Sequence, residues 1–242
     1  MLLQLDNVSK SFGALKVINN VSFDLEEGIA LGIMGPNGAG KTTLLNLIAG
    51  DLPLSAGDIR FNGQSLSGVS AEQRCLSGIG RTSQIPRPFT GMTVYENVLV
   101  GAMYGSNLSE SEAEEVCVDV LDQTGLLPRW NVEASQLRLL ERKRLELARA
   151  LATRPRLLLL DEIAGGLTDH EVQELLQLIR DIRSQGITII WIEHIVHALV
   201  SVVDRIVAID FGNKLVEGAP KEVINSDEFK QVYFGVESVK LG

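Results

Sequence analysis

The sequence predicts an α/β fold in which a helical segment is inserted into one core, and three observations indicate it. Short apolar stretches with strand character open the chain, helical periodicity replaces them over about residues 95–151, and strand-like stretches then return. The stretches at residues 157–160 and 187–192 flank a helical one at 172–182, and this order of strand, helix and strand is typical of a parallel sheet. We therefore expect a single α/β core rather than two independent domains.

The remaining strands are predicted from their apolar runs, at residues 2–8, 21–25, 29–34 and 205–209. The third of these runs is nearly all apolar, as expected of a parallel strand buried on both faces. It leads into a glycine-rich turn and then into a helical stretch at residues 43–49.

The inserted segment carries a helix start and a helical repeat. Ser109 and Glu112 have the spacing of a capping box, in which each side chain bonds the backbone N–H of the other residue. Apolar residues then recur at helical spacing, at Ala113, Val116, Cys117, Val120 and Leu121.

Composition places the chain among ordinary globular proteins of a reducing cytosol. Its 242 residues can bury one large core, and its hydrophobic fraction of 45% and charged fraction of 22% are ordinary. No apolar run approaches the roughly 20 residues that span a bilayer, and Gln4 and Asp6 interrupt the apolar start before a signal sequence could form. Cys75 and Cys117 have neither metal-ligand nor disulfide spacing. The net charge of −9 argues against a nucleic-acid partner, because duplex DNA requires a basic surface.

A phosphate-binding loop follows the third strand. The eight residues match the pattern G-x-x-x-x-G-K-[ST] at every fixed position: Gly35, Pro36, Asn37, Gly38, Ala39, Gly40, Lys41 and Thr42. Glycines let the backbone wrap around an anion, and the following helix presents unpaired N–H groups to it. We expect Lys41 to reach the β- and γ-phosphates of a nucleotide and the Thr42 hydroxyl to bind Mg²⁺.

An acidic pair, Asp161 and Glu162, ends the apolar strand at residues 157–160. Ligands of open α/β sheets bind at this end of the strands. Together with the phosphate loop, the pair indicates a P-loop NTPase in which Asp161 holds the Mg²⁺ shell and Glu162 accepts a proton from the attacking water.

Four further features make the chain resemble the ATP-binding subunits of ABC transporters over essentially its whole length. Phe12 matches the aromatic residue that stacks on adenine, and Gln84 matches the glutamine that senses Mg²⁺ and the γ-phosphate. Residues 144–151 look like the helix that follows the family signature, and His194 matches the histidine that contacts the γ-phosphate. Each feature is weak alone, but their order and spacing around the phosphate loop are those of the family.

The resemblance implies a P-loop NTPase fold of the ABC type, with an α/β core, an antiparallel β subdomain and an inserted α-helical subdomain. One domain would cover residues 1–242, with the core at 1–85 and 153–242 and the helical subdomain at about 86–152. The implied activity is hydrolysis of ATP with Mg²⁺, coupled to transport from the cytoplasmic face of the inner or plasma membrane, where the chain would be peripheral.

The resemblance also assigns the site residue by residue. Glu162, His194 and Gln84 would be catalytic, while Thr42, Gln84 and Asp161 would hold Mg²⁺. The residues expected to bind ATP are Phe12, Gly35, Asn37, Gly38, Ala39, Gly40, Lys41, Thr42 and Thr43.

One stretch narrows the resemblance further. Residues 80–98 are similar to the same stretch in the ATPases of branched-chain amino-acid importers, and residues 204–207 and 217–220 fit that group too. Its close relatives include urea and amide importers, so the resemblance implies a small polar solute without identifying it. The segment after Gln84 would contact the transmembrane permease subunits.

The chain departs from the family at the signature, Leu-Ser-x-Gly-Gln. The aligned residues are Leu137, Arg138, Leu139, Leu140 and Glu141. In the family, the signature of one subunit completes the ATP site of the other through a serine hydroxyl and backbone N–H groups. Leu140 adds a side chain where the backbone must approach phosphate, and Glu141 adds a negative charge that Arg138 could offset. Since the chain's own site is complete, we expect a heterodimer with a second ABC ATPase that supplies an intact signature.

The loop after the acidic pair departs as well. Ile163 stands where proline is usual, and Thr168 replaces an aspartate or asparagine. We favour a structural role for Thr168, because it forms a capping-box pattern with Glu171.

Two other functional classes stay open. A catalytically impaired, ATP-dependent regulatory subunit of a heterodimeric ABC transporter would explain the altered signature. A soluble ABC-type protein of repair or translation would usually carry two phosphate loops, a coiled-coil insertion or a basic surface, and this sequence has none of them. Substitution of Glu162 separates the transport ATPase from the regulatory subunit, because only the ATPase would lose turnover.

Overall fold

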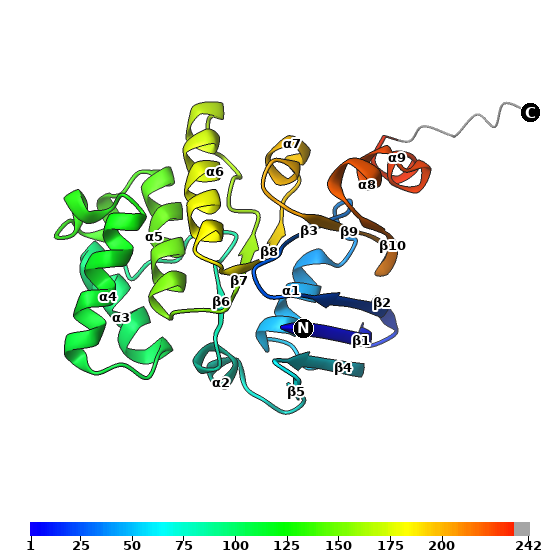
Figure 1. Cartoon of the computed structure of the whole chain (residues 1–242), viewed down its shortest axis with the longest axis horizontal. Helices are drawn as coiled ribbons and strands as arrows, with labels where there is room; N and C mark the ends of the chain where they lie inside the picture. The colour runs from blue at the N-terminus through cyan, green and yellow to red at the C-terminus, as the bar shows by residue number, and fades with distance from the viewer. Residues whose placement is uncertain (235–242) are drawn as a thin grey trace, which may run out of the picture. The chain divides into compact units, whose positions relative to one another are not determined.

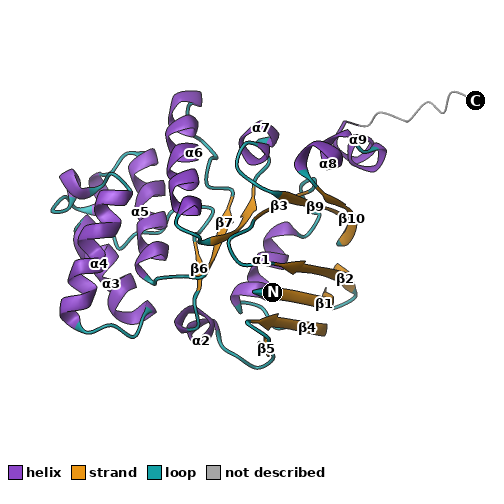
Figure 2. Ribbon diagram, viewed as in Figure 1, coloured by secondary structure: helices purple, strands orange, loops and turns teal. Residues whose placement is uncertain are grey.

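The computed structural model describes residues 1–234 of the chain (Figures 1 and 2). The chain folds into two compact units, of which the first comprises Met1–Val69 and the chain from Ile190 onward and the second comprises Ser70–Ile189. The predicted division into a core and a helical subdomain stays a prediction, and its last residues, 235–242, lie outside the described part of the chain.

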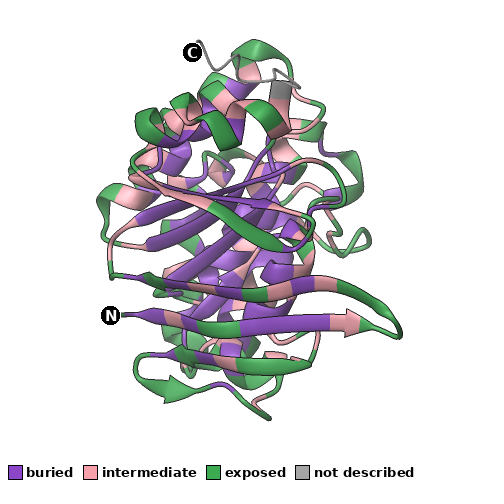
Figure 3. Cartoon of the chain, turned by 90° about the vertical axis from the view of Figure 1, so that its right-hand side faces the viewer, coloured by how far each residue is buried: buried purple, intermediate pink, exposed green. Residues whose placement is uncertain are grey.

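An antiparallel sheet forms one part of the first unit. Its strands are β1 (Leu3–Phe12), β2 (Leu15–Leu25), β4 (Ala56–Phe61) and β5 (Gln64–Ser65). They lie in the order β2-β1-β4-β5, which confirms the antiparallel β subdomain that the family resemblance implied. Buried and exposed residues alternate along β2 and β4, because one face of such a sheet is packed and the other is open (Figure 3).

A mixed sheet with helices forms the other part of the first unit. The strands of this sheet that lie wholly within the first unit are β3 (Ala30–Met34), β9 (Arg205–Asp210) and β10 (Asn213–Gly218). β9 pairs in parallel with β3 and antiparallel with β10. All five residues of β3 are buried, as its apolar sequence predicts. The helices of this unit are α1 (Lys41–Ala49), α7 (Val196–Val200), α8 (Pro220–Asn225) and α9 (Asp227–Phe234).

The second unit is mostly helical. Its α-helices are α2 (Ala71–Leu76), α3 (Val94–Gly105), α4 (Glu110–Gln123), α5 (Leu139–Ala152) and α6 (Asp169–Ser184), with short 3₁₀ turns at Leu127–Arg129 and Ala134–Gln136. Helix α3 packs on both α4 and α5 (Figure 2). Strand β6 (Ile79–Arg81) pairs in parallel with β7 (Leu157–Asp161), and β8 (Thr188–Ile192) begins in this unit and ends in the first. Within residues 1–234, no helix has both the length and the apolar character needed to cross a membrane.

Both predicted capping boxes are confirmed. At the start of α4, the Ser109 hydroxyl accepts from the Glu112 N–H at 3.4 Å, and the Glu112 carboxylate accepts from the Ser109 N–H at 2.8 Å. At the start of α6, Thr168 and Glu171 make the same two bonds at 3.4 and 2.8 Å. Thr168 therefore has the structural role that its spacing predicts.

The extension of β1 beyond residue 8 and the strand β4 were not predicted, because their local sequence is unfavourable for a strand. β1 runs on to Phe12 through register shifts that follow Leu5, where Asn7 takes a φ of 47° and breaks the alternation. β4 includes Gly57 and Asp58, two residue types that are depleted in strands, and it is stabilised by pairing with β1 instead. A local sequence pattern does not indicate which distant strand a segment pairs with.

The two thiols provide a test of the packing of the second unit. Burial raises the pKa of Cys117 to about 11 and also raises the pKa of Cys75. At about pH 8, only about one Cys117 thiol in a thousand is then ionised, and the thiolate is the form that reacts with maleimide. In the Cys75→Ser variant, we expect Cys117 to be labelled at least about 100-fold more slowly in the native chain than in concentrated guanidinium chloride. Equal rates in the two conditions, followed by mass spectrometry, would contradict the packing described.

Candidate functional site

The phosphate loop joins β3 to α1 within the first unit, and its glycines are required by the space around it. Gly40 precedes α1 with a φ of 100°, and a Cβ there would lie 2.7 Å from Ile18 Cδ1 and 2.8 Å from the Val17 carbonyl oxygen. At Gly35, an added Cβ would collide with the carbonyl oxygen of Ile209 on β9. The fixed glycines of the motif therefore allow a turn that no other residue could make without displacing its neighbours.

Lys41 is turned into the loop that contains it. Its side chain is buried, and its ammonium donates to the carbonyl oxygens of Gly35 at 2.7 Å and Pro36 at 3.0 Å. Asn37 and Thr42 are exposed, so the loop offers polar groups outward at the start of a helix. A cation, backbone N–H groups and a helix N-terminus together suit a phosphate chain.

The other predicted residues of the loop also lie where a ligand can reach or where packing holds the turn. Gly38 is exposed with a φ of 83°, Ala39 is buried, and Thr43 is half-buried in the first turn of α1. The Ala39 carbonyl oxygen accepts from the Gly212 N–H at 3.1 Å, which fixes the loop to the turn between β9 and β10.

Phe12 ends β1 with its ring in the open. The residue is 47% exposed, and the ammonium of Lys10 lies 5.0 Å from the ring centroid. The same ammonium donates to the Pro53 carbonyl oxygen at 2.7 Å. An exposed aromatic ring at a strand end can stack on a flat base, which is the role predicted for it.

His194 follows β8 and is held by its neighbour Glu193. Nδ1 of His194 lies 3.2 Å from a carboxylate oxygen of Glu193, and the His194 N–H donates to the same oxygen at 3.0 Å. The Glu193 side chain is fully buried, whereas the imidazole is 55% exposed. With Nδ1 bonded to Glu193, Nε2 is the nitrogen that can meet a ligand. No role was predicted for Glu193, although its position directly before His194 was the available signal.

Gln84, Asp161 and Glu162 lie in the second unit, and the structure brings two of them together. The amide of Gln84 donates to the Glu162 carboxylate at 2.6 Å. Asp161 is buried at the end of β7, and its backbone N–H lies 3.5 Å from the Thr82 hydroxyl. Glu162 has a φ of 45°, a left-handed conformation that is costly for a residue with a side chain and that is common at functional sites.

The predicted site residues are divided between the two units. The first unit carries Phe12, the phosphate loop at residues 35–42 and His194, and the second carries Gln84, Asp161 and Glu162. The assignment of these residues to ATP, to Mg²⁺ and to catalysis stays a prediction.

The segment aligned with the signature forms the start of α5 and is capped from within. Arg138 is the N-cap residue, and its backbone N–H donates to the Glu141 carboxylate at 2.9 Å. The other carboxylate oxygen lies 3.1 Å from Nε of Arg129. Leu139 is 40% exposed beside this cap. The negative charge expected at Glu141 is therefore present, but Arg129 compensates it, which sequence analysis missed.

Polar side chains of α5 also hold the segment after Gln84. Nζ of the buried Lys143 donates to the Gln84 carbonyl oxygen at 3.1 Å. One turn further, buried Glu146 accepts from the Arg87 N–H at 2.6 Å, and Arg149 donates to the Arg87 carbonyl oxygen at 2.9 Å. Lys143, Glu146 and Arg149 are spaced by three residues, so they share one face of the helix. Helix α5 thus connects its altered start to the backbone of Gln84.

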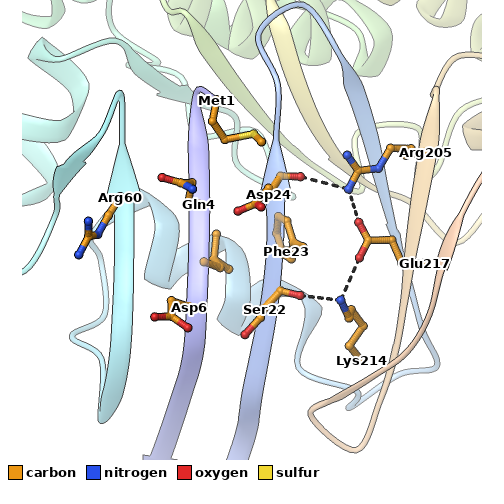
Figure 4. Close-up of a pocket in the computed structure, with 11 residues that line it drawn as sticks. Met1, Gln4, Asp6, Ser22, Phe23, Asp24, Arg60, Arg205, Lys214 and Glu217 are labelled. Atoms are coloured by element: carbon orange, nitrogen blue, oxygen red, sulfur yellow. Dashed lines mark hydrogen bonds and ion pairs between the residues drawn. The ribbon is translucent and has the colours of Figure 1, made fainter.

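A polar groove of about 820 Å³ on the first unit is distinct from these residues (Figure 4). Glu217 is paired there with both Arg205 and Lys214. Arg205 donates to the Asp24 carbonyl oxygen at 3.1 Å and Lys214 to the Ser22 carbonyl oxygen at 2.7 Å, so these hydrogen bonds join β9 and β10 to β2. None of the predicted site residues lines this groove.

Comparison with known sequences gives a consistent set of relatives. The family model described as ABC transporter matches residues 18–165. The high-affinity branched-chain amino acid transport ATP-binding protein LivG of Salmonella typhimurium is 35% identical, over 97% of this chain and 98% of its own. BraF of Pseudomonas aeruginosa, described in the same words, is 34% identical over the same shares. The lipopolysaccharide export system ATP-binding protein LptB of Haemophilus influenzae is 30% identical over 99% of both chains.

Solved structures similar to this chain agree with the sequence comparison. A nucleotide-free ATP-binding cassette from an ABC transporter superposes with a TM-score of 0.88 at 27% identity, over 96% of this chain and 98% of its own. The ADP conformation of MJ1267, an ATP-binding cassette of an ABC transporter, has a TM-score of 0.88 at 28% identity, over 97% and 99%. The predicted fold class is confirmed.

The crowding at Gly40 leads to a test of the loop. Gly40→Ala and Gly63→Ala both place a side chain at positive φ, which costs about 1 kcal/mol in each case. Only at Gly40 does the new Cβ meet Ile18 and Val17, because no atom lies within 4 Å of a Cβ at Gly63. We expect Gly40→Ala to weaken ADP binding by at least about tenfold in calorimetry. Gly63→Ala should bind as the wild type does, and equal affinity of both variants would refute the steric argument.

Proposed function

The chain belongs to the ABC transporter family of ATP-binding subunits and is an ATPase, and from that premise we propose that it powers an importer of branched-chain amino acids or of a related small polar solute. The observation that carries this proposal is the match to LivG and BraF, which spans 97% of the chain. LptB, whose name specifies lipopolysaccharide export, is less similar at 30% identity. Import is therefore preferred to export.

ATP binding is proposed to use the residues of the phosphate loop together with Phe12. The exposed ring of Phe12 stacks on adenine, and Lys41 leaves the carbonyls of its own loop to meet the β- and γ-phosphates. Backbone N–H groups from Asn37 to Thr43 complete the cradle. The positive charge of Lys41 and the backbone N–H groups of the loop favour a nucleoside triphosphate over a neutral ligand.

Mg²⁺ fits the oxygen donors of this chain. Thr42 is exposed at the start of α1 in the first unit, and Asp161 is a buried carboxylate at the end of β7 in the second. Mg²⁺ prefers such oxygen ligands and retains several waters, through which Asp161 and Gln84 would act. When bound, the ion neutralises charge on the β- and γ-phosphate oxygens.

Hydrolysis is assigned to Glu162, Gln84 and His194. A water molecule attacks the γ-phosphorus, the bond to the β–γ bridging oxygen breaks, and ADP and phosphate leave. Glu162 orients the water and accepts its proton, and Gln84 holds the Glu162 carboxylate by its 2.6 Å hydrogen bond. His194, kept in place by Glu193, stabilises the charge on the phosphoryl oxygens through Nε2.

We further propose that the chain works as a heterodimer with a second ABC ATPase. The chain's own catalytic residues are complete, whereas the start of α5 carries Leu140 and the carboxylate of Glu141 where the family has glycine and glutamine. Glu141 already occupies the Arg138 N–H, which reduces what α5 can offer to a phosphate of the partner's ATP. ATP bound to this chain would be hydrolysed in a site that the partner's intact signature completes.

The segment after Gln84 is proposed to contact the permease subunits at the cytoplasmic face of the membrane. Ile85 and Phe89 are exposed there, at 69% and 43%, and exposed apolar side chains favour a protein contact. The guanidinium of Arg149 lies 4.7 Å from the centre of the Phe89 ring. The bonds from α5 to Gln84 and Arg87 would carry movement of this segment to the Gln84–Glu162 pair.

A second candidate, an ATP-dependent regulatory subunit without turnover, is favoured by one observation only. That observation is the altered start of α5. It affects what this chain gives to its partner, while Glu162, Gln84 and His194 are retained, so the catalytic role is preferred.

The solute is tested by uptake. In cells that lack this chain, we expect uptake of labelled leucine at low concentration to fall by about tenfold or more, because an importer without its ATPase loses its energy source. Wild-type chain should restore uptake, whereas Lys41→Ala should not. Unchanged uptake of leucine, isoleucine and valine would contradict the branched-chain proposal. Loss of urea or amide uptake instead would assign the related solutes.

The proposed heterodimer is tested by steady-state ATPase assays. The chain alone is expected to turn over slowly, and addition of its partner ATPase should raise activity by about 10-fold or more, because the partner supplies the signature. Glu162→Gln in this chain should lower the activity of the mixture by about 100-fold or more.

A matched variant restores the signature in this chain. Arg138→Ser with Leu140→Gly and Glu141→Gln should give measurable activity to the chain alone. Turnover of the unmodified chain alone at rates of about 1–10³ per second would refute the heterodimer. Retained activity of the Glu162→Gln mixture would instead favour the regulatory subunit.

A further inference from the structure

The C-terminal helix α9 is bonded to the first residue of the phosphate loop. The backbone N–H of Gly35 donates to the hydroxyl oxygen of Tyr233 at 2.6 Å, across 198 residues of sequence. Gly35 is buried, so a lost hydroxyl would not simply be replaced by bulk water. Both residues lie in the first unit.

The position of Tyr233 is fixed by the packing of α9. Its ring stacks on that of Phe229, with centroids 4.3 Å apart and an angle of 16° between the planes. Phe229 is 1% exposed, so the stacked pair is anchored in the core of the unit. At the start of the helix, the Ser226 carbonyl oxygen accepts from the Lys230 N–H at 3.1 Å. The tyrosine hydroxyl is thus held in place by apolar packing and helix geometry rather than by surface contacts.

Gly35 links this hydroxyl to the phosphate-binding cation. The N–H of Gly35 is bonded to Tyr233, and its carbonyl oxygen accepts from the Lys41 ammonium at 2.7 Å. The two groups belong to neighbouring peptide units, so a shift at one moves the other. Tyr233 therefore acts on the residue that positions Lys41, although it is distant from the loop in sequence.

We propose that Tyr233 is a positioning residue of the phosphate loop and that α9 is part of the nucleotide site. The hydroxyl keeps the start of the loop in its phosphate-binding conformation before the nucleotide binds. The loop therefore loses less conformational entropy on binding. A partner that draws α9 away from the unit would weaken the hold on nucleotide. The inference rests on the proposed nucleotide site and extends it to the C-terminal helix.

The test is Tyr233→Phe in the full-length chain, which keeps the ring and removes only the hydroxyl. We expect the dissociation constant for ADP, measured by calorimetry, to rise about 3- to 10-fold, the effect of one lost hydrogen bond. In the assembled ATPase, KM for ATP should rise by a similar factor while kcat changes less than about twofold, because the reacting groups are untouched. Amide hydrogen exchange at Gly35, followed by NMR, should become faster in the variant.

Tyr104→Phe is the matched control, since it removes the same hydroxyl group from a tyrosine that is 75% exposed on α3 in the other unit. It should leave ADP affinity and exchange at Gly35 unchanged. An ADP affinity of Tyr233→Phe that is equal to or tighter than that of the wild type, or unchanged exchange at Gly35, would overturn the inference. Failure of the wild-type chain to bind ADP would instead refute the nucleotide site itself.

Discussion

The ammonium of Lys41 is buried inside the loop that carries it, and its hydrogen bonds to the carbonyls of Gly35 and Pro36 hold that loop around a positive charge. A buried cation is tolerated only when it is hydrogen-bonded in this way. The backbone can wrap this closely because Gly35 and Gly40 have no Cβ. A Cβ at Gly35 would collide with Ile209, and one at Gly40 would collide with Val17 and Ile18. The apolar strand before the loop, the helix after it and the hydrogen bond from Gly35 to Tyr233 all support this arrangement, on which the proposed ATP site is built.

In the second unit, helix α5 holds the predicted site residues in position, as the loop around Lys41 does in the first unit. Its buried face holds the backbone of Gln84 through Lys143, and the side chain of Gln84 holds Glu162. Its start, where the family has a phosphate-binding signature, is closed by Glu141 and Arg129. One helix therefore holds the residue that positions Glu162, the proposed catalytic carboxylate, while the N-terminal end of the same helix is capped by its own side chains. This division is the physical basis for expecting a partner that differs from this chain.

The sequence predicted best where a motif requires a local conformation. The phosphate loop, the apolar strand β3 and the capping boxes of α4 and α6 depend on neighbouring residues only, and the structure has them as predicted. β4 and the contacts of Lys143 were missed, because a strand of low intrinsic propensity and a buried ion are both stabilised by residues that are distant in the sequence. The negative charge of Glu141 was predicted, but its ion pair with Arg129 was not, because Arg129 lies on a separate turn.

By itself, the sequence determined the family, the residues predicted to bind phosphate and the departure at residues 137–141, because these follow from residue identity and spacing. The tertiary structure decided how those residues are held. It placed the Gln84 amide on Glu162, buried Glu193 beneath His194 and brought the Tyr233 hydroxyl to Gly35. Such contacts join segments through burial and hydrogen bonding, and no local pattern encodes which distant group will satisfy a buried N–H or carboxylate.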